Sequence, residues 1–221
     1  MKTKKIFITG CARSGTTLLA RMFHAFEDVS VVENECTLED FTEYCSANEG
    51  HFRIIVGKRT ERSIFSNVLS EEETQKQLKL IEDNDISIVN CVRDGRFVVD
   101  SWLRAWGVFN PFVWMVSIME AEKHMSYIKS TVYYEHLVES PAFVQQLMEI
   151  LVNEKAKESF KDYPKFVPEH CFPSEDDRYK PRPLEVDNRV PPLSYTDKPN
   201  DVETFKELLI ELGYEQPIRE S

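Results

Sequence analysis

Short apolar runs divide the first half of the chain into predicted strands. They lie at residues 6–9, 28–32, 53–57 and 86–92, and each ends at glycine or at charged residues. After the first run, apolar residues recur at helical spacing, as do those around residues 38–45, 97–103, 143–151 and 205–212. Short apolar strands that alternate with amphipathic helices are typical of an α/β fold. We therefore predict a central, mostly parallel sheet flanked by helices.

The chain length favours one folded unit. At 221 residues and 42% hydrophobic content, the chain can bury a sizeable core as a single domain over residues 1–221. Residues 163–199 are proline-rich and charged, without periodicity, so we predict an irregular loop region there. Irregular segments of this length in a compact domain tend to be functional.

Charge and cysteine content exclude several classes of protein. The net charge of −11 and a pI near 5.0 argue against binding to nucleic acid or to an anionic membrane. Five cysteines without a C-x-x-C pair predict reduced thiols, and neither a disulfide framework nor a metal site. The first apolar run is too short for a signal peptide, and no run reaches transmembrane length. We expect a soluble cytoplasmic protein that does not insert into a membrane, of unknown oligomeric state.

The segment between the first strand and the first helix has the pattern of a phosphate-binding loop. Gly10 and Gly15 bracket the loop, and a helix is predicted to open at Thr16 and Thr17. Backbone N–H groups of such a loop, together with the positive end of the helix dipole, bind anions. The pattern G-x-x-x-x-G-T-T has Thr16 where a nucleoside triphosphate loop has lysine, and the only cation within the loop is Arg13. The sequence therefore predicts a phosphate-type ligand without the usual triphosphate lysine.

The loop A-R-S-G-T-T resembles the segment P-R-S-G-T-T or P-K-S-G-T-T with which the sulfotransferase family begins. The resemblance implies a three-layer, P-loop-like fold. It also implies the donor 3′-phosphoadenosine 5′-phosphosulfate, which leaves adenosine 3′,5′-bisphosphate (PAP) as product. By this resemblance, the residues that bind the 5′-phosphosulfate are Ala12, Arg13, Ser14, Gly15, Thr16 and Thr17.

A second motif lies at the end of the strand predicted over residues 86–92. Arg93 follows that strand directly, and Ser101 follows Arg93 by eight residues. A guanidinium and a hydroxyl together suit the oxygens of a phosphate monoester. This spacing resembles that of the sulfotransferases, which implies that Arg93 and Ser101 bind the 3′-phosphate of the nucleotide. A third segment, residues 134–141, resembles the family pattern Y-E-D-L-x-x-x-P, with His136 in place of the acidic residue.

Two glutamates follow the second predicted strand. Functional groups collect beyond the carboxyl ends of parallel strands, so Glu33 or Glu35 is expected beside the phosphate loop. The resemblance implies a glutamate general base at this position, and Glu33 is favoured because it directly ends the strand. The alternative is that both glutamates only favour the N-terminus of the next helix. Lys58 and the two residues after it loosely resemble a Lys-Thr segment that lines the family's active site.

The combined prediction is an enzyme that moves a sulfuryl group to a hydroxyl or amine of a small-molecule or carbohydrate acceptor by in-line displacement. Arg13 is predicted to stabilise the charge that grows on the bridging oxygen. A P-loop kinase or NTPase stays open as an alternative; it would need a lysine at Thr16 and a magnesium-binding aspartate, for which Asp94 is the nearest candidate. A non-catalytic nucleotide-binding relative is the other alternative. The resemblance also makes Arg182 and Arg189 candidates for a loop that covers the nucleotide.

Overall fold

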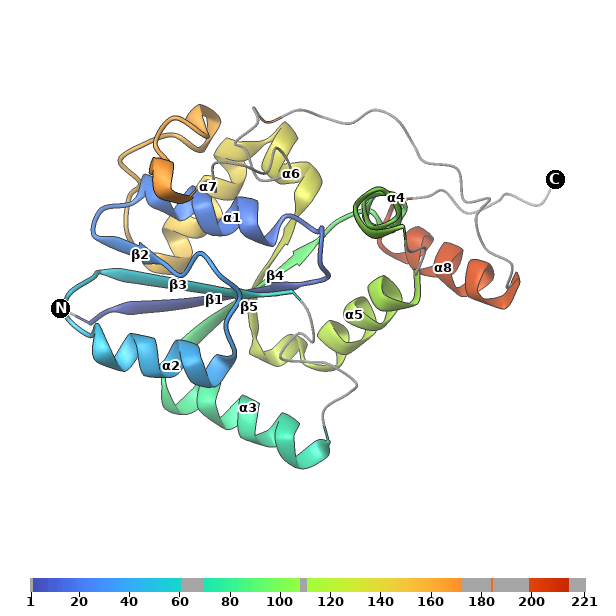
Figure 1. The fold of residues 1–221 in the computed structure, drawn as a ribbon, viewed down its shortest axis with the longest axis horizontal. Helices are drawn as coiled ribbons and strands as arrows, with labels where there is room; N and C mark the ends of the chain where they lie inside the picture. The colour runs from blue at the N-terminus through green and yellow to red at the C-terminus, as the bar shows by residue number, and fades with distance from the viewer. Residues whose placement is uncertain (1, 61–69, 108–110, 172–183, 185–198, 215–221) are drawn as a thin grey trace.

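The computed structural model describes residues 2–60, 70–107, 111–171, 184 and 199–214. Five strands in this part of the chain form one sheet in the order β2-β3-β1-β4-β5, and every neighbouring pair is parallel (Figure 1). The strands are β1 (Lys4–Gly10), β2 (Val29–Val31), β3 (Ile54–Arg59), β4 (Ile86–Val92) and β5 (Ile128–Tyr133). Strand β1 is central, with β3 and β2 on one side of it and β4 and β5 on the other. Ligands of such folds usually bind beyond the carboxyl ends of the central strands, which is where the loop after β1 lies.

Helices cover both faces of the sheet. In Figure 1, α1, α6 and α7 lie on one side of the strands, and α2 and α3 lie on the other. The α-helices are α1 (Thr16–Met22), α2 (Leu38–Ala47), α3 (Glu71–Asp83), α4 (Gly95–Trp106), α5 (Pro111–Lys123), α6 (Tyr134–Glu139), α7 (Pro141–Val152) and α8 (Pro199–Glu211). The short 3₁₀ turns are η1 (Phe23–Ala25), η2 (Met125–Tyr127), η3 (Phe160–Asp162) and η4 (Glu169–Cys171). The predicted three-layer α/β fold is confirmed.

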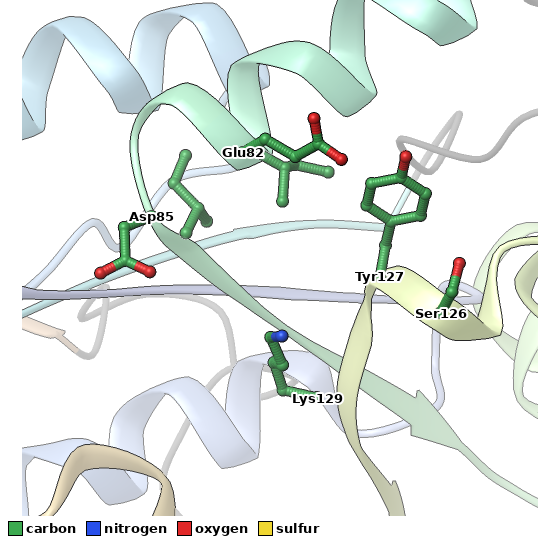
Figure 2. A pocket seen from close by; sticks show the side chains of 7 residues that line it. Glu82, Asp85, Ser126, Tyr127 and Lys129 are labelled. Carbon is green, nitrogen blue, oxygen red and sulfur yellow. The ribbon is translucent and has the colours of Figure 1, made fainter.

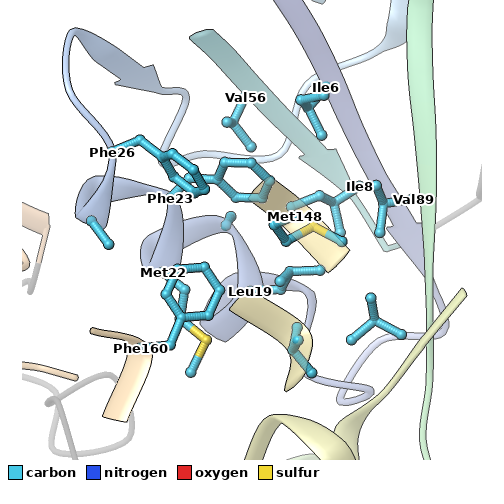
Figure 3. Close-up of a cluster of buried hydrophobic side chains, with 14 of the residues drawn as sticks. Ile6, Ile8, Leu19, Met22, Phe23, Phe26, Val56, Val89, Met148 and Phe160 are labelled. Atoms are coloured by element: carbon cyan, nitrogen blue, oxygen red, sulfur yellow. The ribbon is translucent and has the colours of Figure 1, made fainter. Parts of the chain in front are cut away.

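Alternation along β1 explains why both faces are covered. Ile6 and Ile8 are buried in the cluster formed with α1 and α7, which Figure 3 shows from close by. Phe7 points to the opposite face, where its ring lies 5.1 Å from that of Phe41 on α2. Successive side chains of a strand face opposite sides, so a central strand covered on both faces must be apolar throughout. The continuous apolar run that marked this strand in the sequence is the consequence.

A third cluster packs beyond the carboxyl end of β4. Trp114 of α5 is fully buried, and its ring lies 5.2 Å from the ring of Phe205 on α8. The Trp114 indole Nε1 donates a hydrogen bond to the Arg93 carbonyl oxygen at 2.9 Å. Helices α5 and α8 therefore hold the backbone at the position where the second motif begins.

The element boundaries agree closely with the pattern of the sequence. Strand β4 has the bounds predicted, whereas β1 extends two residues further at its start and one at its end, and β2 is one residue shorter at each end. Of the region predicted to be irregular, residues 163–171, 184 and 199 are described, and they include η4 and the first residue of α8. Arg182 and Arg189 lie outside the described residues. No helix in the described ranges is long and apolar enough to cross a membrane.

Candidate functional site

Two glycines shape the loop between β1 and α1. Gly10 has a φ of 144°, and a Cβ added there would lie 2.3 Å from the carbonyl oxygen of Cys91 on β4. Gly15 has a φ of 93°, and a Cβ there would lie 2.6 Å from the ring of Tyr134. Only glycine combines these backbone angles with such close approaches. The loop is thus packed tightly against β4 and against the start of α6.

Arg13 links the two predicted motifs. It adopts a left-handed backbone conformation, with a φ of 75°, which is uncommon for a residue other than glycine and is found most often at functional sites. Its Nε donates a hydrogen bond of 2.9 Å to Oγ of Ser101 on α4, a residue 88 positions later in the chain. Its guanidinium carbon also lies 5.8 Å from the ring centroid of Trp106. The phosphate loop and the end of the β4 motif therefore form a single site.

Arg93 lies on the other side of the loop. One of its terminal nitrogens, Nη1, donates to the Arg13 carbonyl oxygen at 3.2 Å, and its guanidinium carbon lies 4.0 Å from the ring centroid of Tyr134. Its Nε is buried and has no hydrogen-bond partner in the described structure. The sequence paired Arg93 directly with Ser101; the structure brings both to the loop, with Arg13 as the residue that contacts each of them.

Other loop groups are also available to an anion. The Ser14 hydroxyl is buried without a partner in the described residues, a state that costs about 1–3 kcal/mol when no ligand or water satisfies it. Gly15 precedes α1, whose first turn has neither a side-chain cap nor an acidic residue. The N–H groups of that turn, which carries Thr16 and Thr17, are the ones that an α-helix leaves without an internal partner. The predicted loop residues thus present several donors to one place.

Three aromatic residues also belong to this site, and no role in nucleotide binding was predicted for them from the sequence. The Trp102 indole Nε1 donates to the Ala12 carbonyl oxygen at 3.1 Å, which fixes the loop backbone. Trp106 lies one helical turn further along α4, with its ring 4.9 Å from that of Trp102 and 49% of its surface exposed. Tyr134 contacts both Gly15 and Arg93. Two of them had a signal in the sequence: Trp102 is adjacent to Ser101, and Tyr134 begins the third segment that resembles the family pattern.

Glu33 lies after β2 and is engaged on both carboxylate oxygens. Oε2 accepts from Arg21 Nε at 3.3 Å, and Oε1 lies 3.4 Å from His24 Nε2. Burial acts to raise the pKa of Glu33, but hydrogen bonds from His24 and Cys171 and the charge of Arg21 prevail and lower that pKa below its ordinary value. The Arg21 guanidinium also donates to the Cys171 carbonyl oxygen. Glu33 is thus a partner of the C-terminal half of α1.

Glu35 lies in different surroundings. Its side chain is exposed and accepts a hydrogen bond from the Thr60 hydroxyl, just after β3. The backbone beside it is tied to β3 by a hydrogen bond of 3.2 Å from Cys36 N to the Lys58 carbonyl oxygen. Lys58 is 5% exposed; burial lowers its pKa, and the charges of Glu35 and Glu33 act against that shift. Because Lys58 pairs with Ile8 of β1, this group of charges lies at the carboxyl end of the strand next to the one that enters the phosphate loop.

Asp94, the candidate for a magnesium ligand, is committed to structural contacts. It is 4% exposed and caps α4 by accepting a hydrogen bond from the Arg96 backbone N–H at 2.9 Å. Its Oδ2 also forms an ion pair of 2.5 Å with the Arg96 guanidinium. The Asp94 backbone N–H donates to Glu135, which also accepts from the Tyr214 hydroxyl. The Asp94 carboxylate therefore orients Arg96, which in turn donates to the Tyr214 carbonyl oxygen at 2.8 Å and so links α4 to the chain after α8.

A surface pocket of about 310 Å³ lies at the other end of the strands (Figure 2). It is formed where α3 ends and where β4 and β5 begin. Its lining consists of Ile81, Glu82, Asp85, Ile86, Ser126, Tyr127 and Lys129. In a parallel sheet the amino ends lie opposite the loops that bind ligands. This pocket is separate from the candidate site.

Comparison with known proteins supports the same assignment. Residues 5–137 match the model of the sulfotransferase family, and these residues include both motifs and both glutamates. The fold is similar to the sulfotransferase domain from the curacin biosynthetic pathway, with a TM-score of 0.65 and 16% identity over 97% of this chain and 99% of that one. It is also similar to the sulfotransferase domain of the Synechococcus PCC 7002 olefin synthase (TM-score 0.61, 13% identity, 94% and 96% covered). Mouse sulfotransferase SULT7A1, solved in complex with PAP, matches with a TM-score of 0.55 and 14% identity over 94% and 84% of the two chains. No curated protein sequence matches the chain.

Proposed function

The chain belongs to the sulfotransferase family, and we propose that it transfers a sulfuryl group from 3′-phosphoadenosine 5′-phosphosulfate to a hydroxyl or amine of a small-molecule or carbohydrate acceptor. The observation that carries this proposal is the hydrogen bond of 2.9 Å between Arg13 and Ser101. It joins a loop suited to the 5′-phosphosulfate to a helix position suited to the 3′-phosphate. One nucleotide with phosphates at both positions would use both groups.

The donor-binding residues are proposed to divide between the two ends of the nucleotide. The loop N–H groups, with the hydroxyls of Ser14, Thr16 and Thr17, bind the 5′-phosphosulfate. Arg93 and Ser101 bind the 3′-phosphate, for which the unpartnered Nε of Arg93 is a ready donor. When the nucleotide binds, the Ser101 hydroxyl can turn from Arg13 to the 3′-phosphate, and the exposed Arg13 guanidinium is proposed to turn to the sulfuryl end.

The proposed reaction is an in-line displacement at sulfur. The acceptor oxygen or nitrogen attacks the sulfur, the bond from sulfur to the bridging oxygen breaks, and PAP leaves with the negative charge on its 5′-phosphate. By analogy with phosphoryl transfer, such a reaction is accelerated mainly by positioning and by stabilisation of charge. Arg13 is proposed to stabilise the charge, because this exposed residue belongs to the loop proposed to bind the leaving phosphate.

The general base is proposed to be Glu35 or Glu33, and exposure to solvent favours Glu35. A base needs a carboxylate oxygen within hydrogen-bond reach of the acceptor proton, and a pKa that is not depressed. Both Glu33 oxygens are engaged, by Arg21 and by His24, and the pKa of Glu33 is lowered. Glu35 is exposed at the carboxyl end of the sheet, where an acceptor could approach.

Two observations argue against the P-loop kinase or NTPase. Thr16 replaces the lysine that such enzymes use on the β and γ phosphates. Asp94, the nearest candidate for the magnesium-binding carboxylate, is buried in an ion pair with Arg96. A site that holds the sulfate donor requires neither the lysine nor the metal.

Nucleotide selectivity tests this proposal directly. We expect PAP to bind far more tightly than AMP, ADP or ATP, without magnesium, because only PAP carries a 3′-phosphate. At about 100 times its dissociation constant, PAP should raise the melting temperature by roughly 5–10 °C. Arg93→Ala should remove the preference for PAP over AMP. Isothermal titration calorimetry and thermal unfolding measure both effects.

Arg104→Ala is the matched control for Arg93→Ala. Arg104 also lies on α4, but its side chain is 56% exposed and pairs with Asp100, so its loss should leave PAP binding unchanged. Transfer itself is detected by mass spectrometry of an acceptor panel incubated with isotopically labelled donor. A preference for ATP that needs magnesium and survives Arg93→Ala would contradict the proposal.

A further inference from the structure

Three side chains that can bind metals meet on the α1 face of the sheet, away from the phosphate loop. His24 comes from η1, Glu33 follows β2, and Cys171 ends η4. Each offers one ligand atom, and these three atoms all lie within 4.8 Å of one another. Cys171 is 2% exposed, and the side chains of His24 and Glu33 are 13% and 25% exposed. The group is thus sheltered but lies close enough to the surface for an ion to enter.

Two of the three distances within this group match the edges of a metal coordination shell, and the third pair of ligand atoms lies within 4.8 Å. Cys171 Sγ lies 3.5 Å from His24 Nε2, and His24 Nε2 lies 3.4 Å from Glu33 Oε1. Zinc binds sulfur at about 2.3 Å and nitrogen or oxygen at about 2.0–2.2 Å in a tetrahedron, which puts neighbouring ligand atoms about 3.3–3.6 Å apart. An ion could therefore bind the three atoms with little movement of the side chains.

The arrangement is unsuited to nucleophilic catalysis by the cysteine. In a Cys-His-carboxylate triad, the thiol contacts one imidazole nitrogen and the carboxylate contacts the other. Here the sulfur and the carboxylate oxygen both lie beside Nε2 of His24. Convergence of one sulfur, one nitrogen and one oxygen is what a metal ion requires.

The surroundings of the carboxylate also fit a ligand. Oε2 of Glu33, the oxygen that does not face His24, accepts from Arg21 Nε at 3.3 Å. Ligating carboxylates are commonly oriented by a hydrogen bond of this kind to the second oxygen. The Arg21 guanidinium also contacts the Cys171 carbonyl oxygen, so it holds two of the three ligand residues in place. Burial and the neighbouring Glu33 raise the pKa of the Cys171 thiol to about 12. A bound cation would offset the negative charge of Glu33 and favour the thiolate.

We propose that His24, Glu33 and Cys171 form a zinc-binding site that ties η4 to η1 and to the residues after β2. The thiolate and imidazole exclude calcium and magnesium, which prefer oxygen ligands, and favour zinc among the common divalent ions. Three protein ligands leave the fourth position of the tetrahedron to water. The role is structural: the ion joins residues that are up to 147 positions apart in the chain.

Cobalt and zinc titrations of the full chain test the site. The protein is first treated with a chelator and a thiol-free reductant, and Co²⁺ is then added as a spectroscopic probe for Zn²⁺. We expect one equivalent of Co²⁺ to produce a thiolate-to-cobalt charge-transfer band and the visible bands of a tetrahedral ion, and one equivalent of Zn²⁺ to remove them. At about 100 times the dissociation constant, Zn²⁺ should raise the melting temperature by roughly 5–10 °C.

Variants assign the ligands. Cys171→Ser should abolish the charge-transfer band and weaken zinc binding by roughly a hundredfold or more, since the loss even of a residue that only orients a ligand costs 10–100-fold. Cys36→Ser is the matched control: it removes a half-buried thiol outside the group and should leave the band unchanged. His24→Gln, which retains the thiol, should weaken zinc binding and lower the intensity of the visible bands. Circular dichroism checks that each variant is folded.

Two results would overturn the proposal. One is the absence of stoichiometric Co²⁺ or Zn²⁺ binding by the folded wild-type protein, in which case the three side chains form only a hydrogen-bonded cluster. The other is a charge-transfer band that survives Cys171→Ser, which would place the metal elsewhere. Neither result depends on sulfuryl transfer, so this inference and the proposed function can fail independently.

Discussion

The two ends of α1 carry two arginines in opposite states. Arg13, in the loop before the helix, is exposed and contacts the hydroxyl of Ser101. Arg21, in the last turn, is 7% exposed and contacts the Glu33 carboxylate and the Cys171 carbonyl oxygen. A cation held against a partly buried carboxylate stabilises the fold, whereas an exposed cation in the loop before the helix is placed to respond to an anionic ligand. The two glutamates differ in exposure in the same way: Glu33 is partly buried against Arg21, whereas Glu35 is exposed.

Replacement of the two glutamates should give the largest difference in the rate of transfer. Glu35→Gln should lower the rate of transfer by roughly 10²–10⁴-fold, the usual contribution of a general base, and leave PAP affinity unchanged. Glu33→Gln should lower thermal stability more than it lowers the rate. Steady-state kinetics and thermal unfolding measure the two effects. The exposed Glu43 of α2 provides the control, because Glu43→Gln should change neither. Full activity in both Glu35→Gln and Glu33→Gln would refute a carboxylate base; loss of activity in Glu33→Gln alone would reverse the assignment.

Arg13→Ala should reduce the catalytic rate by roughly 10²–10³-fold, the scale for loss of one donor that stabilises a transition-state charge. PAP affinity should fall much less, because the loop N–H groups, Arg93 and Ser101 remain. Pre-steady-state kinetics together with calorimetry distinguish the two quantities. If PAP affinity falls strongly while the rate at saturating donor is unchanged, Arg13 is a binding residue. The proposal that Arg13 stabilises the transition state would then be wrong.

Arg21→Ala should act on stability instead. Removal of Arg21 from this partly buried pair leaves Glu33 without its permanently charged partner, and we expect a loss of about 3 kcal/mol in the free energy of unfolding. For a chain of this length that corresponds to roughly 6–12 °C in melting temperature. The matched control is Arg104→Ala, which breaks an exposed pair with Asp100 and should cost under about 1 kcal/mol. Equal losses in the two variants, measured by denaturant unfolding, would mean that Arg21 has no special structural role.

The smallest expected effect is on the dependence of stability on pH. The pKa of Glu33 in the folded protein is lowered from its ordinary value of 4.5, so its contribution to stability is present above that value and is lost as the pH falls through the folded pKa. The difference in melting temperature between the wild type and Glu33→Gln should therefore shrink below pH 4.5. Thermal unfolding from neutral to acidic pH, with a chelator present, measures it. A difference that stays constant across this range would show that Glu33 is not coupled to folding through its charge.

Much of the fold and of the candidate site could be predicted from local pattern. The apolar run at β4 marks a strand buried on both faces, and the two glycines mark the loop, because backbone angles and strand burial restrict residue type locally. The order of the motifs along the chain also places Arg93 and the glutamates at the carboxyl ends of strands. The predicted roles of these residues stay predictions.

The partners of these side chains were decided by the tertiary structure. Ser101 contacts Arg13 because of how α4 packs against the loop, and Glu33 is engaged because α1 presents Arg21, and η1 presents His24, to the end of β2. No spacing in the sequence relates His24 to Cys171, so the sequence predicted no metal ligands. Local sequence determines which backbone conformations are accessible, whereas contacts between residues 88 or 147 positions apart depend on how all the elements pack together.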